Sequence, residues 1–149
     1  MVYNEIQKDL FTVSDDYYLA HCISADFALG AGIAVEFNKR FDMRNQLNLL
    51  YPNYLDKFER HHIGGDCILV GKVFNLITKE KYFYKPTIIT MILSLKKMKE
   101  ICLEKGIKKV AMPTIGAGLD RLNWKDVSNQ IHNIFVDTDI EILVCKKVI

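Results

Sequence analysis

Lys108-Lys109-Val110-Ala111-Met112 is followed directly by Pro113-Thr114-Ile115-Gly116-Ala117-Gly118-Leu119, a short apolar run and then a loop of small residues. The same arrangement occurs earlier, where the apolar run Tyr17–Ile23 leads into the polar and small residues 24–32. Short apolar runs bounded by turn residues are typical of strands that are buried on both faces. Two such strands, each followed by a glycine-bearing loop, predict an α/β domain.

The rest of the chain alternates between helical and extended patterns. We expect helices at residues 33–41 and 43–50, from Pro86-Thr87 to a stop at Gly106, and after an N-cap at Asn123, and strands at 68–70, 73–77 and 140–144. The long helix is expected to bury one apolar stripe, formed by Ile88, Ile92, Leu95 and Met98 with Ile89 and Cys102 beside them. Alternation of this kind predicts a layered fold with a largely parallel central sheet. Residues 53–65 carry no readable pattern.

Composition limits the class of protein. The chain has 149 residues, half of them apolar and 26% charged, which suits one domain over residues 1–149. We find neither a run of roughly 20 apolar residues nor a secretory signal, and expect an intracellular, cytoplasmic protein, or a nuclear one in a eukaryote. The 4 cysteines are far apart and are expected to be reduced.

Neither the charge distribution nor the spacing of possible metal ligands indicates a nucleic-acid-binding or metal-binding protein. The net charge of +2 does not single out nucleic acid as a partner, although lysines cluster locally. His61-His62 near Cys67 suggests a metal, but adjacent histidines cannot easily face one ion and no second ligand pair follows. The sequence therefore predicts no metal site and no cofactor.

The two glycine-bearing loops carry the functional signal. Gly30-Ala31-Gly32 stands just before a predicted helix, where glycine allows close approach of a ligand and free backbone amides attract anions. The loop Thr114–Leu119 has the same character. Because ligands of parallel sheets bind at the carboxyl ends of the strands, we expect the loops to form opposite walls of one diphosphate cleft. Neither loop has the spacing of a P-loop or of a dinucleotide-binding turn.

Five motifs together resemble those of a known family. They are, in order, His21-Cys22-Ile23-Ser24, Gly30-Ala31-Gly32-Ile33-Ala34, Leu76-Ile77-Thr78-Lys79, Lys85-Pro86-Thr87 and Met112-Pro113-x-x-Gly116-x-Gly118-Leu119-Asp120-Arg121-Leu122. Their order resembles that of macrodomains, and more narrowly that of the terminal ADP-ribose protein glycohydrolases and the related bacterial DNA ADP-ribose hydrolases. The resemblance runs from about Ile6 to about Val144.

The resemblance implies a three-layer α/β/α macrodomain with a mixed, largely parallel sheet, binding ADP-ribose across the carboxyl edge of the strands. It matches Asp9 to an acidic residue that binds the adenine amino group, although Lys8 stands where the family usually has glycine. The full set of ligand-binding residues that it implies is Asp9, Leu10, Ser24, Gly30, Ala31, Gly32, Ile33, Thr114, Ile115, Gly116, Ala117, Gly118 and Leu119.

Lys79 and Asp120 match the catalytic pair of this branch. The family's proposed chemistry makes the lysine a nucleophile at the anomeric carbon of the distal ribose, through an open-ring imine, while the aspartate transfers protons. A lysine amine attacks only when it is neutral, which partial burial favours, and Lys79 ends an apolar strand. Without the resemblance to the family, Lys79 would be interpreted as an ordinary lysine at the end of a strand. Asp120, next to Arg121, would be interpreted as part of a surface turn or an ion pair.

The predicted function is removal of ADP-ribose from a macromolecule modified on acidic protein side chains or on DNA bases. Three alternatives stay open: a reader that binds ADP-ribose without turnover, an enzyme acting on O-acetyl-ADP-ribose, and one acting on ADP-ribose 1″-phosphate. The expected partners are ADP-ribose and ADP-ribosylated protein or DNA. We expect the protein to act as a monomer and not at a membrane.

Overall fold

The fold of this protein is built on a central sheet with helices on both faces. The computed structural model describes residues 1–61 and 64–148, and within these residues six strands form one sheet in the order β1-β6-β5-β2-β4-β3. All neighbouring strands are parallel except β3 and β4, which are antiparallel. The strands are β1 (Val2–Gln7), β2 (Tyr18–Ser24), β3 (Asp66–Val70), β4 (Val73–Lys79), β5 (Lys109–Met112) and β6 (Glu141–Lys146).

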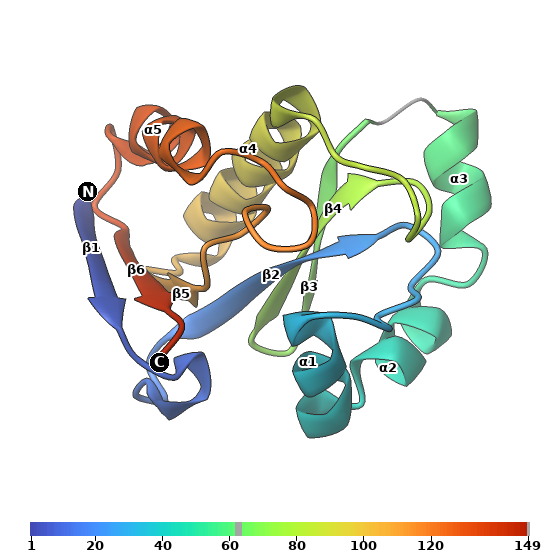
Figure 1. The fold of residues 1–149 in the computed structure, drawn as a ribbon, viewed down its shortest axis with the longest axis horizontal. Helices are drawn as coiled ribbons and strands as arrows, with labels where there is room; N and C mark the ends of the chain where they lie inside the picture. Colours follow the sequence, from blue (N-terminus) through green and yellow to red (C-terminus); the bar gives the residue numbers. More distant parts are fainter. Residues whose placement is uncertain (62–63, 149) are drawn as a thin grey trace.

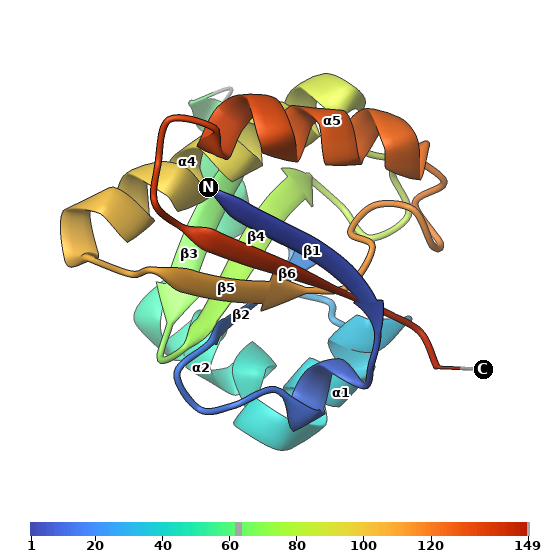
Figure 2. The same ribbon diagram turned by 90° about the vertical axis from the view of Figure 1, so that its left-hand side faces the viewer.

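Figure 1 shows how the helices divide between the two faces, and the view along the sheet in Figure 2 separates the layers. The helices are α1 (Ile33–Phe41), α2 (Met43–Leu50), α3 (Tyr54–Arg60), α4 (Ile88–Lys105) and α5 (Trp124–Phe135), with the 3₁₀ helix η1 (Leu10–Thr12). Helices α4 and α5 bury one face of the sheet, and α1, α2 and α3 contribute to a separate core on the other. The predicted three-layer α/β/α arrangement is confirmed.

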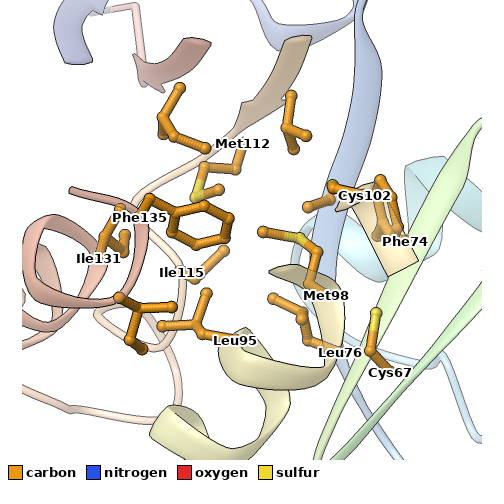
Figure 3. Packing of buried hydrophobic residues seen from close by; sticks show 14 of the residues in the cluster. Cys67, Phe74, Leu76, Leu95, Met98, Cys102, Met112, Ile115, Ile131 and Phe135 are labelled. Carbon is orange, nitrogen blue, oxygen red and sulfur yellow. The ribbon is translucent and has the colours of Figure 1, made fainter. Parts of the chain in front are cut away.

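The core on the α4 and α5 face consists of interlocking aliphatic, sulfur-containing and aromatic side chains (Figure 3). Leu95 and Met98 of α4 pack with Ile131 and Phe135 of α5 and with Met112 of β5, and all of these side chains are fully buried. Close packing of this kind fixes the strand that carries the second glycine-bearing loop.

Most of the predicted elements are present close to their expected bounds, and the helices at 33–41 and 43–50 match fully. The predicted caps of the later helices are also confirmed. Thr87 forms a capping box with Thr90, Gly106 ends α4 at a φ of 68°, and the side chain of Asn123 accepts a hydrogen bond from the amide of Asp126.

The apolar stripe of α4 was predicted with one residue too many. Ile89 is 66% exposed, whereas the fully buried face runs through Met91 and Leu95. With about 3.6 residues per turn, Ile89 lies on the side of α4 away from Met91 and Leu95, whereas Ile88 packs against the core. The buried Ser94 resembles an interruption of the stripe in the sequence, but its hydroxyl donates to the backbone carbonyls of Ile77 and Thr90.

Two structural elements, β1 and α3, carried no recognisable signal in the sequence. In β1 the alternation is reversed, because Val2 and Ile6 are exposed while Tyr3 and Glu5 turn inward and bond to each other. Helix α3 is only 7 residues long and lies in the segment that appeared patternless. Edge strands and short helices depend on their neighbours rather than on local pattern.

The four cysteines lie in or beside the hydrophobic core. Cys67, Cys102 and Cys145 are buried, and Cys22 is partly buried; all 4 are free thiols. Among the described residues no helix is both long and apolar enough to cross a membrane. His62 lies outside the described residues, and within them no group of three or more histidine, cysteine, aspartate or glutamate side chains could hold a metal ion.

His21 is a buried polar group at the centre of the sheet. Its Nε2 lies 2.7 Å from Oδ1 of Asn75, and its ring stacks on Phe37 at 3.9 Å between centroids. Burial lowers the pKa of His21 from 6.5 to about 4, because charging the ring would remove a cation from water. The folded protein therefore holds this imidazole neutral.

Acid should destabilise the protein through His21 before it protonates most carboxylates. The unfolded chain takes up a proton at His21 near pH 6.5, while the folded chain does so only near pH 4. The contribution of the neutral His21 to the free energy of unfolding is therefore fully present above pH 6.5. It is lost as the pH falls toward 4, by about 1.4 kcal/mol per pH unit and ~3 kcal/mol in total. Urea unfolding between about pH 5 and 7 measures this slope. His21→Gln should flatten it, and an unchanged slope in that variant would assign the effect elsewhere.

Candidate active site

A cavity of about 720 Å³ opens at the carboxyl edge of the sheet. It lies between η1, the loop before α1, and the loop after β5, with Cys145, Lys147 and Val148 on one side. Its lining residues are Lys8, Asp9, Leu10, Phe11, Cys22, Ala31, Gly32, Ile33, Ala34, Glu36, Pro113, Thr114, Ile115, Gly116, Gly118, Leu119, Asp120, Cys145, Lys147 and Val148. The structure thus brings both glycine-bearing loops to one cavity.

The first loop presents the N-terminus of α1 to this cavity. Gly32 is the N-cap, with a φ of 62°, a left-handed value that a glycine tolerates, and no side chain caps this end. The amides of the first turn therefore keep their capacity to bind an anion. A Cβ at Gly32 would lie 3.4 Å from Cδ1 of Leu119, so the two loops almost touch across the cavity.

The second loop is held in a tight turn. The amide of Leu122 donates to the carbonyl of Gly116 at 2.7 Å, and Nζ of Lys85 donates to the carbonyl of Leu119 at 2.9 Å. Within the described residues, the amides of Gly118 and Leu119 donate to no protein acceptor. This wall of the cavity therefore also offers backbone N–H groups to a negatively charged ligand.

Gly116 is the position where this loop requires glycine. Its φ is 73°, and a Cβ there would lie 2.7 Å from Cε of Met91 and 3.0 Å from Cδ1 of Leu122. We expect Gly116→Ala to lower the free energy of unfolding by about 2 kcal/mol, through backbone strain and overpacking. Gly118→Ala is the matched control, because it has ordinary φ and open space around the added methyl group. Equal stability of the two variants in thermal unfolding would show that the turn relaxes freely.

Asp9 lies at the other end of the cavity. It caps η1, and its Oδ1 accepts a hydrogen bond from the amide of Phe11 at 3.0 Å. Its Oδ2 has no protein partner among the described residues, so one carboxylate oxygen can accept a hydrogen bond from a ligand amino group. Phe11 supplies an aromatic edge beside it, with the guanidinium of Arg40 4.3 Å from the ring centroid.

Lys79 and Asp120 meet at the edge of the cavity. Nζ of Lys79 donates a hydrogen bond to Oδ1 of Asp120 at 2.7 Å, and the two side chains are only 14% and 16% exposed. The pair joins the end of β4 to the loop after β5, on either side of β2. Partial burial with direct contact lets a proton move between the amine and the carboxylate without crossing bulk solvent.

Three of the predicted ligand-binding residues lie outside the cavity lining. Ser24 is buried and its hydroxyl donates to the carboxylate of Asp26, which in turn accepts from the amide of Ala28. Gly30 and Ala117 belong to the two loops but do not line the space between them. The other loop residues that were predicted to bind the ligand do line the cavity.

The cavity also contains residues that sequence reasoning missed. Cys22 lies near the Lys79 and Asp120 pair, and burial raises the pKa of its thiol, with a smaller contribution from the Asp120 charge. This thiol therefore stays protonated at neutral pH and is a poor nucleophile. The available signal was its position two residues before the end of β2, the strand that leads into the first glycine-bearing loop.

Comparison with known proteins places this geometry in a family. No protein-family model matches the chain. The human ADP-ribose glycohydrolase OARD1 is 38% identical over 143 residues, which cover 93% of this chain and 88% of that protein. The macrodomain of Mycobacterium tuberculosis DarG superimposes with a TM-score of 0.79 at 20% identity, covering 99% of both chains. Thermosipho africanus DarTG in complex with ADP-ribose gives a TM-score of 0.70 at 17% identity, over 99% of this chain and 42% of that one.

The two structural matches support the fold, and the OARD1 match extends the similarity to the sequence of nearly the whole chain. The chain belongs to the macrodomain family, together with the ADP-ribose glycohydrolase OARD1.

Proposed function

We propose that this protein hydrolyses the bond between ADP-ribose and a modified macromolecule, with Lys79 as the nucleophile and Asp120 as the group that transfers protons. The observation that carries the proposal is the 2.7 Å contact between Nζ of Lys79 and Oδ1 of Asp120 at the edge of the cavity. Kinship with a glycohydrolase supports the reaction class.

The residues around the cavity favour one orientation of ADP-ribose, with the adenine at Asp9 and the distal ribose at Lys79 and Asp120. The free carboxylate oxygen of Asp9 would accept the adenine amino group, and the amides at Gly32 and in the loop after β5 would bind the diphosphate. The distal ribose would then lie beside the Lys79 and Asp120 pair. The lining of the same cavity includes four more residues that the sequence predicted as ligand contacts, Leu10, Ile33, Thr114 and Ile115.

The proposed chemistry begins with a proton transfer inside the pair. Asp120 accepts a proton from Nζ of Lys79, and the neutral amine attacks C1″ of the distal ribose. The bond from C1″ to the target breaks and its electron pair leaves with the target. The new ammonium at Nζ gives one proton to the departing target, and the ring oxygen takes the proton held by Asp120 as the ring opens, which leaves a protonated imine between C1″ and Nζ. Asp120, again a carboxylate, takes a proton from a water molecule that adds to C1″ and passes it to Nζ. The C1″–Nζ bond then breaks as the C1″ hydroxyl loses its proton to Nζ, which yields the aldehyde form of free ADP-ribose and restores the charged Lys79 and Asp120 pair.

A reader without turnover is the competing function, because both loops would serve it equally well. An assay of ADP-ribose release beside calorimetry with free ADP-ribose separates the two. The informative substrates are an ADP-ribosylated peptide, an ADP-ribosylated oligonucleotide and a small-molecule ester. Binding without release from any of these substrates would contradict hydrolysis and favour the reader.

A further inference from the structure

Three consecutive aromatic residues follow the catalytic lysine and are uncovered. Tyr82, Phe83 and Tyr84 are 65%, 63% and 42% exposed. Neighbouring ring centroids lie 5.2 Å and 4.9 Å apart at nearly right angles. Three adjacent exposed rings leave apolar surface in contact with water, and exposed apolar surface of this kind is typical of binding sites.

This aromatic segment is anchored rather than loosely attached. The amide of Tyr82 donates to Oδ2 of Asp26 at 3.0 Å, and the amide of Tyr84 closes a turn on the carbonyl of Lys81 at 3.0 Å. At its far end Lys85 is bound to the carbonyl of Leu119. The segment runs from the end of β4 toward α4 (Figure 1), and these bonds tie it to the loops that follow β2 and β5. The rings are therefore presented by a fixed backbone.

Positive charge accompanies the rings. Lys81 and Lys85 flank the three aromatic residues, and Nζ of Lys81 lies 5.9 Å from the ring centroid of Tyr84. Lys81 approaches Glu59 only at 4.0 Å, so its charge is weakly compensated. Rings flanked by cations match the bases and phosphates of a single-stranded nucleic acid, since every base offers a flat face and every linkage a negative charge.

The segment also lies where the target must leave the cavity. Lys79 stands three residues before Tyr82 in the chain, and Lys85 holds the carbonyl of the residue before Asp120. A macromolecule joined to C1″ would emerge between these two side chains. An acidic peptide would offer carboxylates to the lysines but few flat faces to the three rings.

We propose that Tyr82, Phe83 and Tyr84, with Lys81, form a platform that binds the single-stranded nucleic acid flanking an ADP-ribosylated nucleotide. The placement of the modified nucleotide rests on the proposed function, but the platform is tested without it. The probe is an unmodified, fluorescein-labelled single-stranded DNA of mixed sequence, about 12 nucleotides long, followed by fluorescence anisotropy.

Replacing all three rings by serine should weaken binding of this oligonucleotide at least about tenfold, since each base stacked on a ring contributes separately. Tyr82→Phe with Tyr84→Phe keeps the rings and should keep the affinity. Leu103→Ser removes an exposed apolar side chain near the far end of α4 and should change nothing. Lys81→Gln should lower the slope of log affinity against log salt by about 1, whereas Lys96→Gln on the exposed side of α4 should not.

Undiminished oligonucleotide binding by the triple serine variant, with its circular dichroism intact, would overturn the platform. So would a labelled polyglutamate peptide that binds the rings when the oligonucleotide does not. The triple variant should bind free ADP-ribose and release ADP-ribose from the small-molecule ester as the parent protein does. Loss of the platform alone and failure of the lysine mechanism are therefore distinguishable.

Discussion

Lys79→Ala should reduce release of ADP-ribose at least about a thousandfold, because the variant lacks the nitrogen that attacks C1″. This loss corresponds to about 4 kcal/mol of transition-state stabilisation. The measurement is single-turnover release of ADP-ribose from whichever substrate the parent protein accepts. Affinity for free ADP-ribose should be retained, because the contacts proposed for the adenine and the diphosphate come from Asp9, Gly32 and the loop after β5 rather than from Lys79. Full hydrolysis by a folded Lys79→Ala protein would rule out the lysine mechanism.

Lys79→Arg tests whether the lysine acts by its charge or by its nitrogen lone pair. An arginine keeps the positive charge and can still pair with Asp120, but it does not lose its proton in proteins. We therefore expect Lys79→Arg to fold and bind ADP-ribose while remaining inactive. Activity near the parent level in this variant would show an electrostatic role. Lys96→Ala, an exposed lysine of α4, controls for the loss of a surface charge and should stay fully active.

Asp120→Asn should lower the rate of ADP-ribose release by about 10²- to 10⁴-fold, the range expected when a general acid and base is lost. An amide can still accept the hydrogen bond from Lys79, but it cannot take the proton, so the amine stays charged. The readout is the single-turnover rate of ADP-ribose release by the variant, compared with that of the parent protein.

The control for Asp120 is a carboxylate outside the pair. Asp126, exposed in the first turn of α5, takes no part in the cavity, and Asp126→Asn should leave the rate unchanged. If Asp120→Asn has the parent's rate, proton transfer must pass through another group, and the 2.7 Å contact serves only to hold Lys79 in place.

The sequence was sufficient for elements whose signal is local. The apolar run ending at Met112, the helix stop at Gly106 and the N-cap at Asn123 all depend on neighbouring residues, and the structure has them. The two glycine-bearing loops could also be placed at one edge, because the carboxyl ends of parallel strands lie together. Strand β1 could not be predicted, since its pairing with β6 joins opposite ends of the chain.

The features of the site also separate into those that the local sequence predicts and those that depend on the tertiary structure. The sequence by itself determined that small-residue loops follow two buried strands, and the residues flanking them determined the family resemblance. Only the tertiary structure decided that Lys79 and Asp120, 41 residues apart, lie 2.7 Å from each other. Their meeting depends on the strand order, in which β2 lies between β4 and β5. That order depends on which helices cover which face, and the choice is made by packing over the whole core rather than by any local spacing.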